Sequence, residues 1–170
     1  SSERLISLDE YINRMDDIYI NGNGSHVQFD IKKDHEDYAE TLMEELINIP
    51  NCQAWEKDKI PKRFQFINDN TGDYLLLADE GWFITTKTIE EVPFTLGGMH
   101  GYDPALQSMH GIFYAVGVSI REAIQIPAFE NIHIYPLICR LLDISPYDGE
   151  DASQGNIKVL EKILIKDRKK

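Results

Sequence analysis

The chain is organised around residues 97–117, a glycine-rich stretch that leads into an apolar run. Four glycines between 97 and 111 surround His100 and His110, and the turn signal Asp103-Pro104 separates the two histidines. The pattern predicts a loop that feeds a buried strand at 112–116, with His110 at the start of the strand. Glycine permits close backbone approach, and loops held by a rigid scaffold carry binding and catalytic groups. Such a loop can aim an imidazole at a metal ion or an anion.

The length and charge of the chain limit the class of protein. A chain of 170 residues can form a domain that buries roughly 70% of its unfolded surface. The net charge is −12, and because the last twenty residues hold six basic and three acidic groups (+3), residues 1–150 carry −15. Nucleic acid binds basic surfaces, so this balance excludes it as a bulk electrostatic partner. A phosphate substrate held by a metal remains compatible with the charge.

Cysteine usage and hydropathy exclude further classes. Cys52 and Cys139 lie far apart and form no C-x-x-C motif, so two free thiols are expected, with a single bridge as the alternative. No stretch approaches eighteen apolar residues, so we expect no transmembrane helix. The N-terminus lacks an apolar signal core. It enters directly into the structured-looking run at 5–8, so we expect a piece of a longer protein.

Periodicity predicts a small lobe over residues 26–86. The run at 26–31 alternates with period two, as a half-buried strand does, and Asp34 is expected to cap a helix whose apolar face includes Leu42 and Leu46. Further strands are expected at 18–20, 51–57, 64–67, 74–78 and 82–85. A later helix is expected at 134–142, and 157–165 is a short helix or strand. The order β-α-β-β-β predicts a helix packed on one sheet face.

Few chemical motifs stand out from the residues alone. The chain has no P-loop, G-x-G-x-x-G, G-x-S-x-G or H-E-x-x-H motif. A catalytic zinc site commonly needs three protein ligands, so His100 and His110 are more simply two satisfied loop residues. Asp103 is a candidate third ligand, although aspartate before proline is more often a turn residue. The other histidines, at 26, 35 and 133, are expected on exposed faces or at helix starts.

A longer pattern carries a family resemblance. The sequence G-x-H-G-Y-D-x-x-x-x-S-M-H-x-I-F at 98–113 resembles the C-terminal signature of the nucleotide pyrophosphatase/phosphodiesterase family, within the alkaline phosphatase superfamily. The segments 60–64, 77–82 and 129–142 are also similar to that family, so the resemblance covers nearly the whole chain. It implies an α/β (α+β) fold: the C-terminal part of an alkaline-phosphatase-like sheet domain with an inserted α+β lobe. Residues 1–95 are then the lobe, and 96–170 are the C-terminal part of the phosphodiesterase core.

The resemblance also implies a metal centre. The family uses two zinc ions and a threonine nucleophile, which forms a covalent intermediate that water hydrolyses. The histidine of the S-M-H element is a zinc ligand in the family, and it corresponds to His110. His100 and Asp103 match the motif as support for the loop. The nucleophile and an S-D-H-G-M element are expected upstream, so no catalytic nucleophile is expected in this chain.

The function implied is zinc-dependent hydrolysis of phosphodiester or pyrophosphate bonds, with a nucleotide as the small-molecule partner and an extracytoplasmic location. The chain alone, without the N-terminal half of the domain as its partner, is expected to be inactive and to self-associate. Two alternatives remain: a non-catalytic binding or structural module, and a phosphomonoesterase of the same superfamily.

Overall fold

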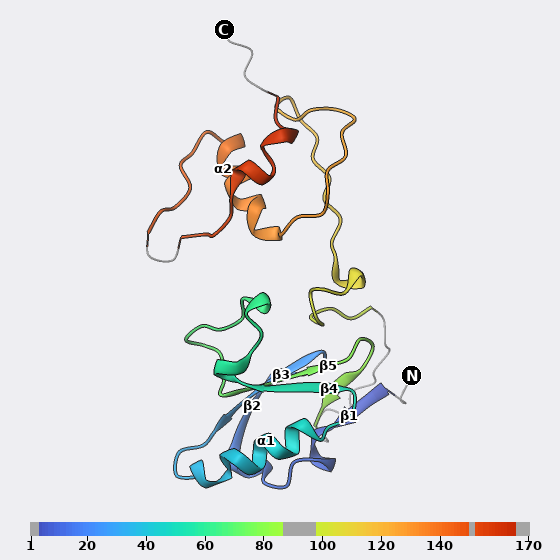
Figure 1. Cartoon of the computed structure of the whole chain (residues 1–170), viewed down its shortest axis with the longest axis vertical. Coiled ribbons are helices and arrows are strands. Elements are labelled where there is room, and N and C mark those ends of the chain that lie inside the picture. Colours follow the sequence, from blue (N-terminus) through green and yellow to red (C-terminus); the bar gives the residue numbers. More distant parts are fainter. Residues whose placement is uncertain (1–3, 87–97, 150–151, 166–170) are drawn as a thin grey trace. The chain divides into compact units, whose positions relative to one another are not determined.

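The computed structural model describes residues 4–86, 98–149 and 152–165. The chain divides into two compact units, residues 1–111 and 112–170 (Figure 1). The predicted domain boundary between residues 95 and 96 lies outside the described residues. No helix in the described part of the chain combines the length and hydropathy needed to cross a membrane.

The first unit contains a four-stranded antiparallel sheet in the order β2-β3-β5-β4. Its strands are β2 (Ile18–Asn21), β3 (His26–Ile31), β4 (Cys52–Glu56) and β5 (Tyr74–Ala78). Gly22 and Gly24 lie between β2 and β3 with positive φ angles of 98° and 92°. This conformation is accessible to glycine at little cost, so the Asn-Gly-Asn-Gly turn closes the hairpin.

A second, parallel sheet joins the beginning of the chain to the strand after β5. Strand β1 (Leu5–Ser7) pairs in parallel with β6 (Phe83–Thr85), with Ile6 opposite Ile84. Both of these isoleucines are buried. The unit therefore combines antiparallel and parallel pairing, as expected for a mixed α/β fold.

Helix α1 (Ala39–Ile47) packs on the antiparallel sheet (Figure 1). Leu42 and Leu46 are fully buried, in one core with Val27, Phe29 and Leu76. This confirms the packing predicted from the helical spacing. The predicted cap is wrong: Asp34 has a φ of +70°, and a 3₁₀ helix at Glu36–Tyr38 precedes α1. A left-handed residue turns the chain before the helix and cannot serve as its cap.

The predicted strand at 64–67 is also wrong. Lys62–Phe64 form a 3₁₀ helix, and Gln65 follows in the left-handed conformation with φ +48°. Phe64 and Phe66 instead pack edge-on, with ring centroids 5.7 Å from Trp55 and 6.0 Å from His26. The two phenylalanines are thus half-buried through individual ring contacts, which do not require a strand ladder.

The second unit is built around α2 (Ile134–Leu141), which follows a 3₁₀ helix at Asn131–His133. Pro136 lies in the first turn of α2, where its missing N–H costs no hydrogen bond. Two further 3₁₀ helices, Ile157–Val159 and Glu161–Ile163, show that this region is helical as far as Ile163, after which Leu164 forms an isolated antiparallel bridge with Ile120. The core contains Leu137 and Leu160.

The predicted strand at 112–116 pairs with no other described segment. Phe113 and Ala115 pack against the core of the second unit, whereas Ile112, Tyr114 and Val116 are 86%, 88% and 98% exposed. The buried strand predicted from the apolar run is therefore wrong for the described residues, because the segment forms no strand and alternate side chains are exposed. A strand also needs a neighbour to exchange backbone hydrogen bonds, and the described residues provide none.

Candidate functional site

The candidate site is the signature loop, which we define as residues 98–111. Tyr102 anchors it to the first unit: the ring is 6% exposed, and its hydroxyl donates a 2.8 Å hydrogen bond to the carbonyl of Trp82. A buried tyrosine places an apolar ring in the core and satisfies its hydroxyl at the same time. The loop is thus tied to the chain segment immediately before β6.

Gly101 fits against the start of β3. It has a φ of +88°, and a Cβ atom placed on it would lie 2.5 Å from the Ser25 hydroxyl oxygen and 3.4 Å from His26 Nδ1. The Ser25 hydroxyl lies 3.2 Å from the same His26 nitrogen. Backbone conformation and space therefore both require glycine here.

The histidine beside Gly101 is more enclosed than the sequence suggested. His26 is half-buried rather than exposed, packed between Ser25, Phe66 and the signature loop. Burial lowers the pKa of His26 from its ordinary 6.5, a hydrogen bond with the Gly101 backbone raises it, and His100 lowers it again. The net effect favours the neutral imidazole, because a charged ring is poorly solvated in this position.

Asp103 forms the charged contact of the loop. Both of its carboxylate oxygens accept hydrogen bonds from the Arg63 guanidinium, with Nη2 and Oδ2 2.5 Å apart. The Oδ1 atom also accepts a 2.9 Å hydrogen bond from the backbone N–H of Ala105. Arg63 holds the pKa of Asp103 below its ordinary 3.8. The Asp103 carboxylate thus accepts hydrogen bonds both from Arg63 and from the backbone of the loop.

The route from Asp103 to His110 is a series of backbone turns. The N–H of Leu106 donates to the Asp103 carbonyl, and the N–H of Met109 donates to the Leu106 carbonyl, each over 3.0 Å. The N–H of His110 then donates to the carbonyl of Gln107 over 3.1 Å, closing a 3₁₀ helix at Gln107–Met109. Leu106 and Met109 pack against the core. The backbone that carries His110 is therefore fixed locally.

His100 and His110 are both exposed. Within residues 4–86, 98–149 and 152–165, no three histidine, cysteine, aspartate or glutamate side chains gather closely enough to hold a metal ion. An exposed imidazole can fill one coordination position on zinc, which needs further protein ligands. The described residues therefore do not form a zinc site on their own.

The cysteines do not add a reactive centre. Cys52 is half-buried and Cys139 is buried, and both thiols are free. Burial, with the negative charge of Asp79, raises the pKa of Cys52 to about 12. The thiolate is the nucleophilic and metal-binding form, so Cys52 is inert near neutral pH.

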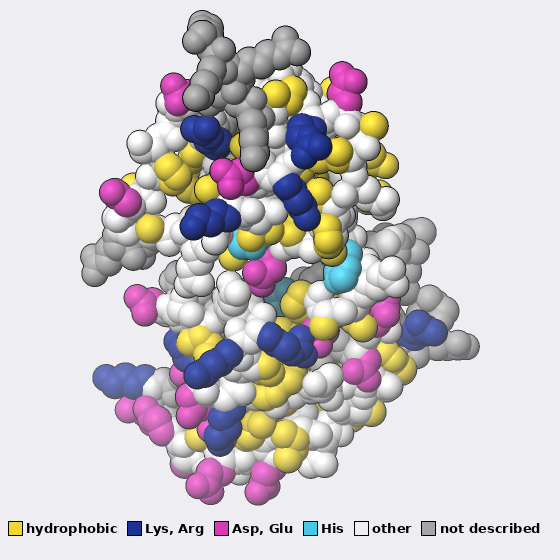
Figure 2. Space-filling model, turned by 45° about the horizontal axis from the view of Figure 1, so that its top comes forward, with side chains coloured by type: hydrophobic (Ala, Val, Ile, Leu, Met, Phe, Trp, Pro, Cys, Tyr) yellow, Lys and Arg dark blue, Asp and Glu magenta, His cyan; other side chains and the backbone are white. Residues whose placement is uncertain are grey.

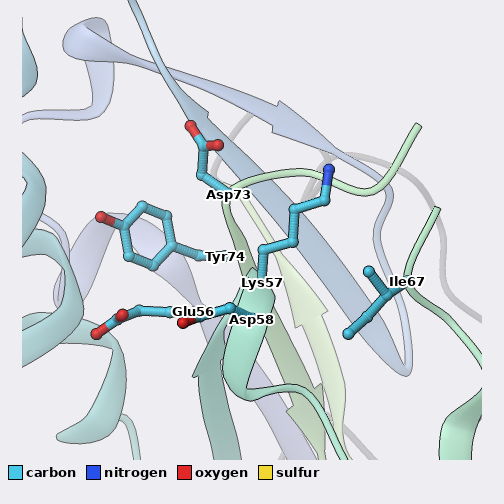
Figure 3. A pocket seen from close by; sticks show the side chains of 6 residues that line it. All are labelled: Glu56, Lys57, Asp58, Ile67, Asp73 and Tyr74. Atoms are coloured by element: carbon cyan, nitrogen blue, oxygen red, sulfur yellow. The ribbon is translucent and has the colours of Figure 1, made fainter. Parts of the chain in front are cut away.

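A shallow pocket of about 560 Å³ lies at the end of β4. Figure 3 shows that its side chains point in different directions, with the Asp73 carboxylate and the Glu56 carboxylate well separated. Lys57 Nζ already donates to the carbonyl of Thr71 over 2.5 Å. The lining residues are Glu56, Lys57, Asp58, Ile67, Asp73 and Tyr74. Nothing in this arrangement directs several polar groups at one ligand atom.

Sequence reasoning missed the two segments that hold the signature loop. Arg63 and the Ser25-His26 pair lie 40 and more than 70 residues before the loop residues they contact, and no local periodicity links such positions. The signal in the sequence is the segment 60–64, which carries a family resemblance and contains Arg63. Its arginine could have been paired with the only carboxylate of the loop, Asp103.

Comparison with known proteins identifies the family of the chain. Residues 1–103 match the sequence profile of the family described as type I phosphodiesterase / nucleotide pyrophosphatase. The chain is 35% identical over 153 residues to human ectonucleotide pyrophosphatase/phosphodiesterase family member 5, covering 88% of this chain and 31% of that protein. It is 29% identical to a venom phosphodiesterase of Naja atra, covering 86% of this chain and 18% of that one.

The solved structure of human ectonucleotide pyrophosphatase / phosphodiesterase 5 matches with a TM-score of 0.84 and 30% identity, covering 96% of this chain and 41% of that one. An inactive murine counterpart in complex with AMP matches with a TM-score of 0.83 and 27% identity, covering 97% of this chain and 42% of that one. The chain thus spans less than half the length of these relatives. The match confirms the predicted fold class, a mixed α/β portion of an alkaline-phosphatase-like domain. This chain belongs to the type I phosphodiesterase / nucleotide pyrophosphatase family.

Proposed function

We propose that the protein containing this chain hydrolyses phosphodiester or pyrophosphate bonds of nucleotides. The observation that carries the proposal is the family match over residues 1–103, together with relatives named as nucleotide pyrophosphatases and phosphodiesterases. The murine relative solved with AMP supports a nucleotide ligand. The names "ectonucleotide" and "venom" of the relatives support an extracytoplasmic location for this protein.

In this proposal His110 supplies one ligand to a zinc site whose other ligands lie outside the chain. The His110 imidazole is exposed, and its backbone is held by the hydrogen-bonded turns that precede it. A side chain that ligates a metal together with residues from another segment needs both this exposure and a fixed backbone. Bound zinc supplies Lewis-acid stabilisation of the phosphoryl oxygens. The contribution of this chain is to hold the imidazole in place, with Tyr102, Gly101 and Asp103 fixing the loop. The nucleophile also comes from outside the chain.

The test replaces His110 in the protein that contains this chain. His110→Ala is expected to lower zinc occupancy and to reduce hydrolysis of a nitrophenyl nucleotide ester by about 10²-fold or more, because removing a ligand misplaces the metal. Zinc content is measured by elemental analysis alongside kcat. The same assay with a nitrophenyl phosphate monoester separates the phosphomonoesterase alternative.

His133→Gln is the control for this experiment. Nδ1 of His133 accepts a 3.0 Å hydrogen bond from the backbone of Asn156, and a glutamine carbonyl can accept a similar bond. The control should therefore retain zinc and activity. Full activity and zinc content in His110→Ala would remove His110 from the site. No hydrolysis of either ester by the wild-type protein would favour the non-catalytic module.

A further inference from the structure

We propose that Arg63 is a positioning residue for His110: through Asp103 it fixes the start of the backbone turns that present the imidazole. This inference rests on the proposed function for its effect on turnover. Its effect on the order of the loop is independent of that function. Neither the family match nor the names of the relatives assigns a role to Arg63.

The guanidinium of Arg63 is also held by contacts outside the loop. It lies over the ring of Phe64, 4.3 Å from the ring centroid, and Phe64 packs edge-on against Trp55 of β4. Stacking on an aromatic face leaves the N–H groups of a guanidinium free to donate in its own plane. The sheet thereby directs the two donors of Arg63 towards Asp103.

The geometry of the Arg63–Asp103 pair is better suited to orienting the loop than to stabilising the first unit against unfolding. Two parallel N–H to oxygen bonds define both the distance and the orientation of the Asp103 carboxylate. The two side chains remain 50% and 22% exposed, and exposed ion pairs contribute little to the free energy of unfolding. We therefore expect the loss of Arg63 to alter the loop rather than to unfold the first unit.

Asp103 transmits this constraint along the loop. The Asp103 carboxylate accepts a hydrogen bond from the N–H of Ala105, and the Asp103 carbonyl accepts one from the N–H of Leu106. This second bond closes the first of the backbone turns that end at His110. Tyr102, the residue before the first turn, is held by its buried ring. This contact fixes the position of Tyr102 but does not by itself fix the direction in which the backbone continues from Asp103. The Arg63 pair supplies a further point of attachment at Asp103, where the turns begin, in addition to the packing of Leu106 and Met109 against the core.

The experiment compares Arg63→Ala with Lys62→Ala in the protein that contains this chain. Lys62 is an exposed cation in the same 3₁₀ helix and is the matched control. Hydrogen exchange of peptides covering 103–110 is measured together with kcat, KM and the melting temperature. In the Arg63→Ala variant the backbone amides of these peptides should exchange several-fold faster than in wild type. The melting temperature should stay close to that of wild type.

Turnover provides the functional readout. In Arg63→Ala we expect kcat to fall about tenfold or more, because a displacement of about 1 Å can cost up to about 10²-fold. KM should change by less than about twofold, since a misplaced metal ligand affects the reaction more than binding. Arg63→Lys should recover little, because an ammonium lacks the planar pair of donors. The exchanged pair Arg63→Asp with Asp103→Arg should recover part of the activity and of the protection.

Equal exchange and equal kcat in the Arg63 and Lys62 variants would overturn the inference. So would a lower kcat with unchanged exchange at 103–110, because Arg63 would then act by another route. If the wild-type protein hydrolyses no ester, the proposed function fails, and exchange decides the inference alone: selective loosening of 103–110 supports it and unchanged protection refutes it.

Discussion

Gly101 carries the sharpest steric requirement in the signature loop. An alanine here would adopt a φ of +88° and place its Cβ 2.5 Å from the Ser25 hydroxyl oxygen. We expect Gly101→Ala to lower the free energy of unfolding by about 1–3 kcal/mol, because left-handed backbone and close contact add together. Urea denaturation measures the change. Gly98→Ala is the control, since its Cβ would meet nothing within 4 Å; equal losses in both variants would contradict the argument.

His26 makes the stability of the first unit depend on pH. Its pKa is lowered in the folded chain mainly by burial, so below its ordinary 6.5 the unfolded chain binds a proton more readily than the folded one. The stabilisation that comes from keeping His26 neutral is complete above pH 6.5, and it is lost as the pH falls towards the lower pKa of His26 in the folded chain. Urea unfolding at pH 7, 6 and 5 should show a steeper loss for wild type than for His26→Gln. Parallel pH profiles would show that His26 does not contribute.

Helix α1 packs on the sheet through the one face that carries Leu42 and Leu46. Leu42 and Leu46 are fully buried, whereas Thr41 on the neighbouring face is exposed. Leu42→Ala should therefore destabilise the first unit by about 2–5 kcal/mol through lost burial and a residual cavity. Thr41→Ala should change stability by less than about 0.5 kcal/mol. Chemical denaturation of the two variants measures both values, and similar losses would place the apolar face of α1 elsewhere.

The second unit of the chain has several large apolar side chains that are exposed. The alternate residues Ile112, Tyr114, Val116 and Val118 are 86–98% exposed, and Leu142 after α2 is 64% exposed. Hydrophobic side chains lie open among the charged ones on the face shown in Figure 2. Contiguous exposed apolar surface and an unpaired strand-like segment both favour association with another chain.

We therefore expect the purified 170-residue chain to self-associate and to show no phosphodiesterase activity with added zinc. A single imidazole does not hold zinc tightly, and the described residues offer no group of three ligands. Light scattering measures the mass, and a nitrophenyl nucleotide ester reports activity. Tyr114→Glu with Val116→Glu should shift the mass towards the monomer. Zinc-dependent turnover in rigorously pure material would mean that a complete site lies within the chain.

The sequence by itself determined the elements whose burial repeats along the chain. Strand β3, helix α1 and helix α2 follow from periodicity because the spacing of side chains on a strand or helix is a local property. Strand β5 follows from a short continuous apolar run, all of which is buried. The signature that contains Tyr102 and Asp103 was likewise readable, since a long motif is specific.

Only the tertiary structure decided which distant groups meet. The pairing of Arg63 with Asp103, the fit of Gly101 beside Ser25 and the burial of His26 join segments that lie far apart in the sequence. The same applies to the segment at 112–116: its apolar run predicted a buried strand, but alternate side chains are exposed and the described residues give it no hydrogen-bonding neighbour. A local pattern specifies what a segment can bury, whereas its partners are set by the path of the whole chain, because ion pairs and strand ladders form between groups brought together in space.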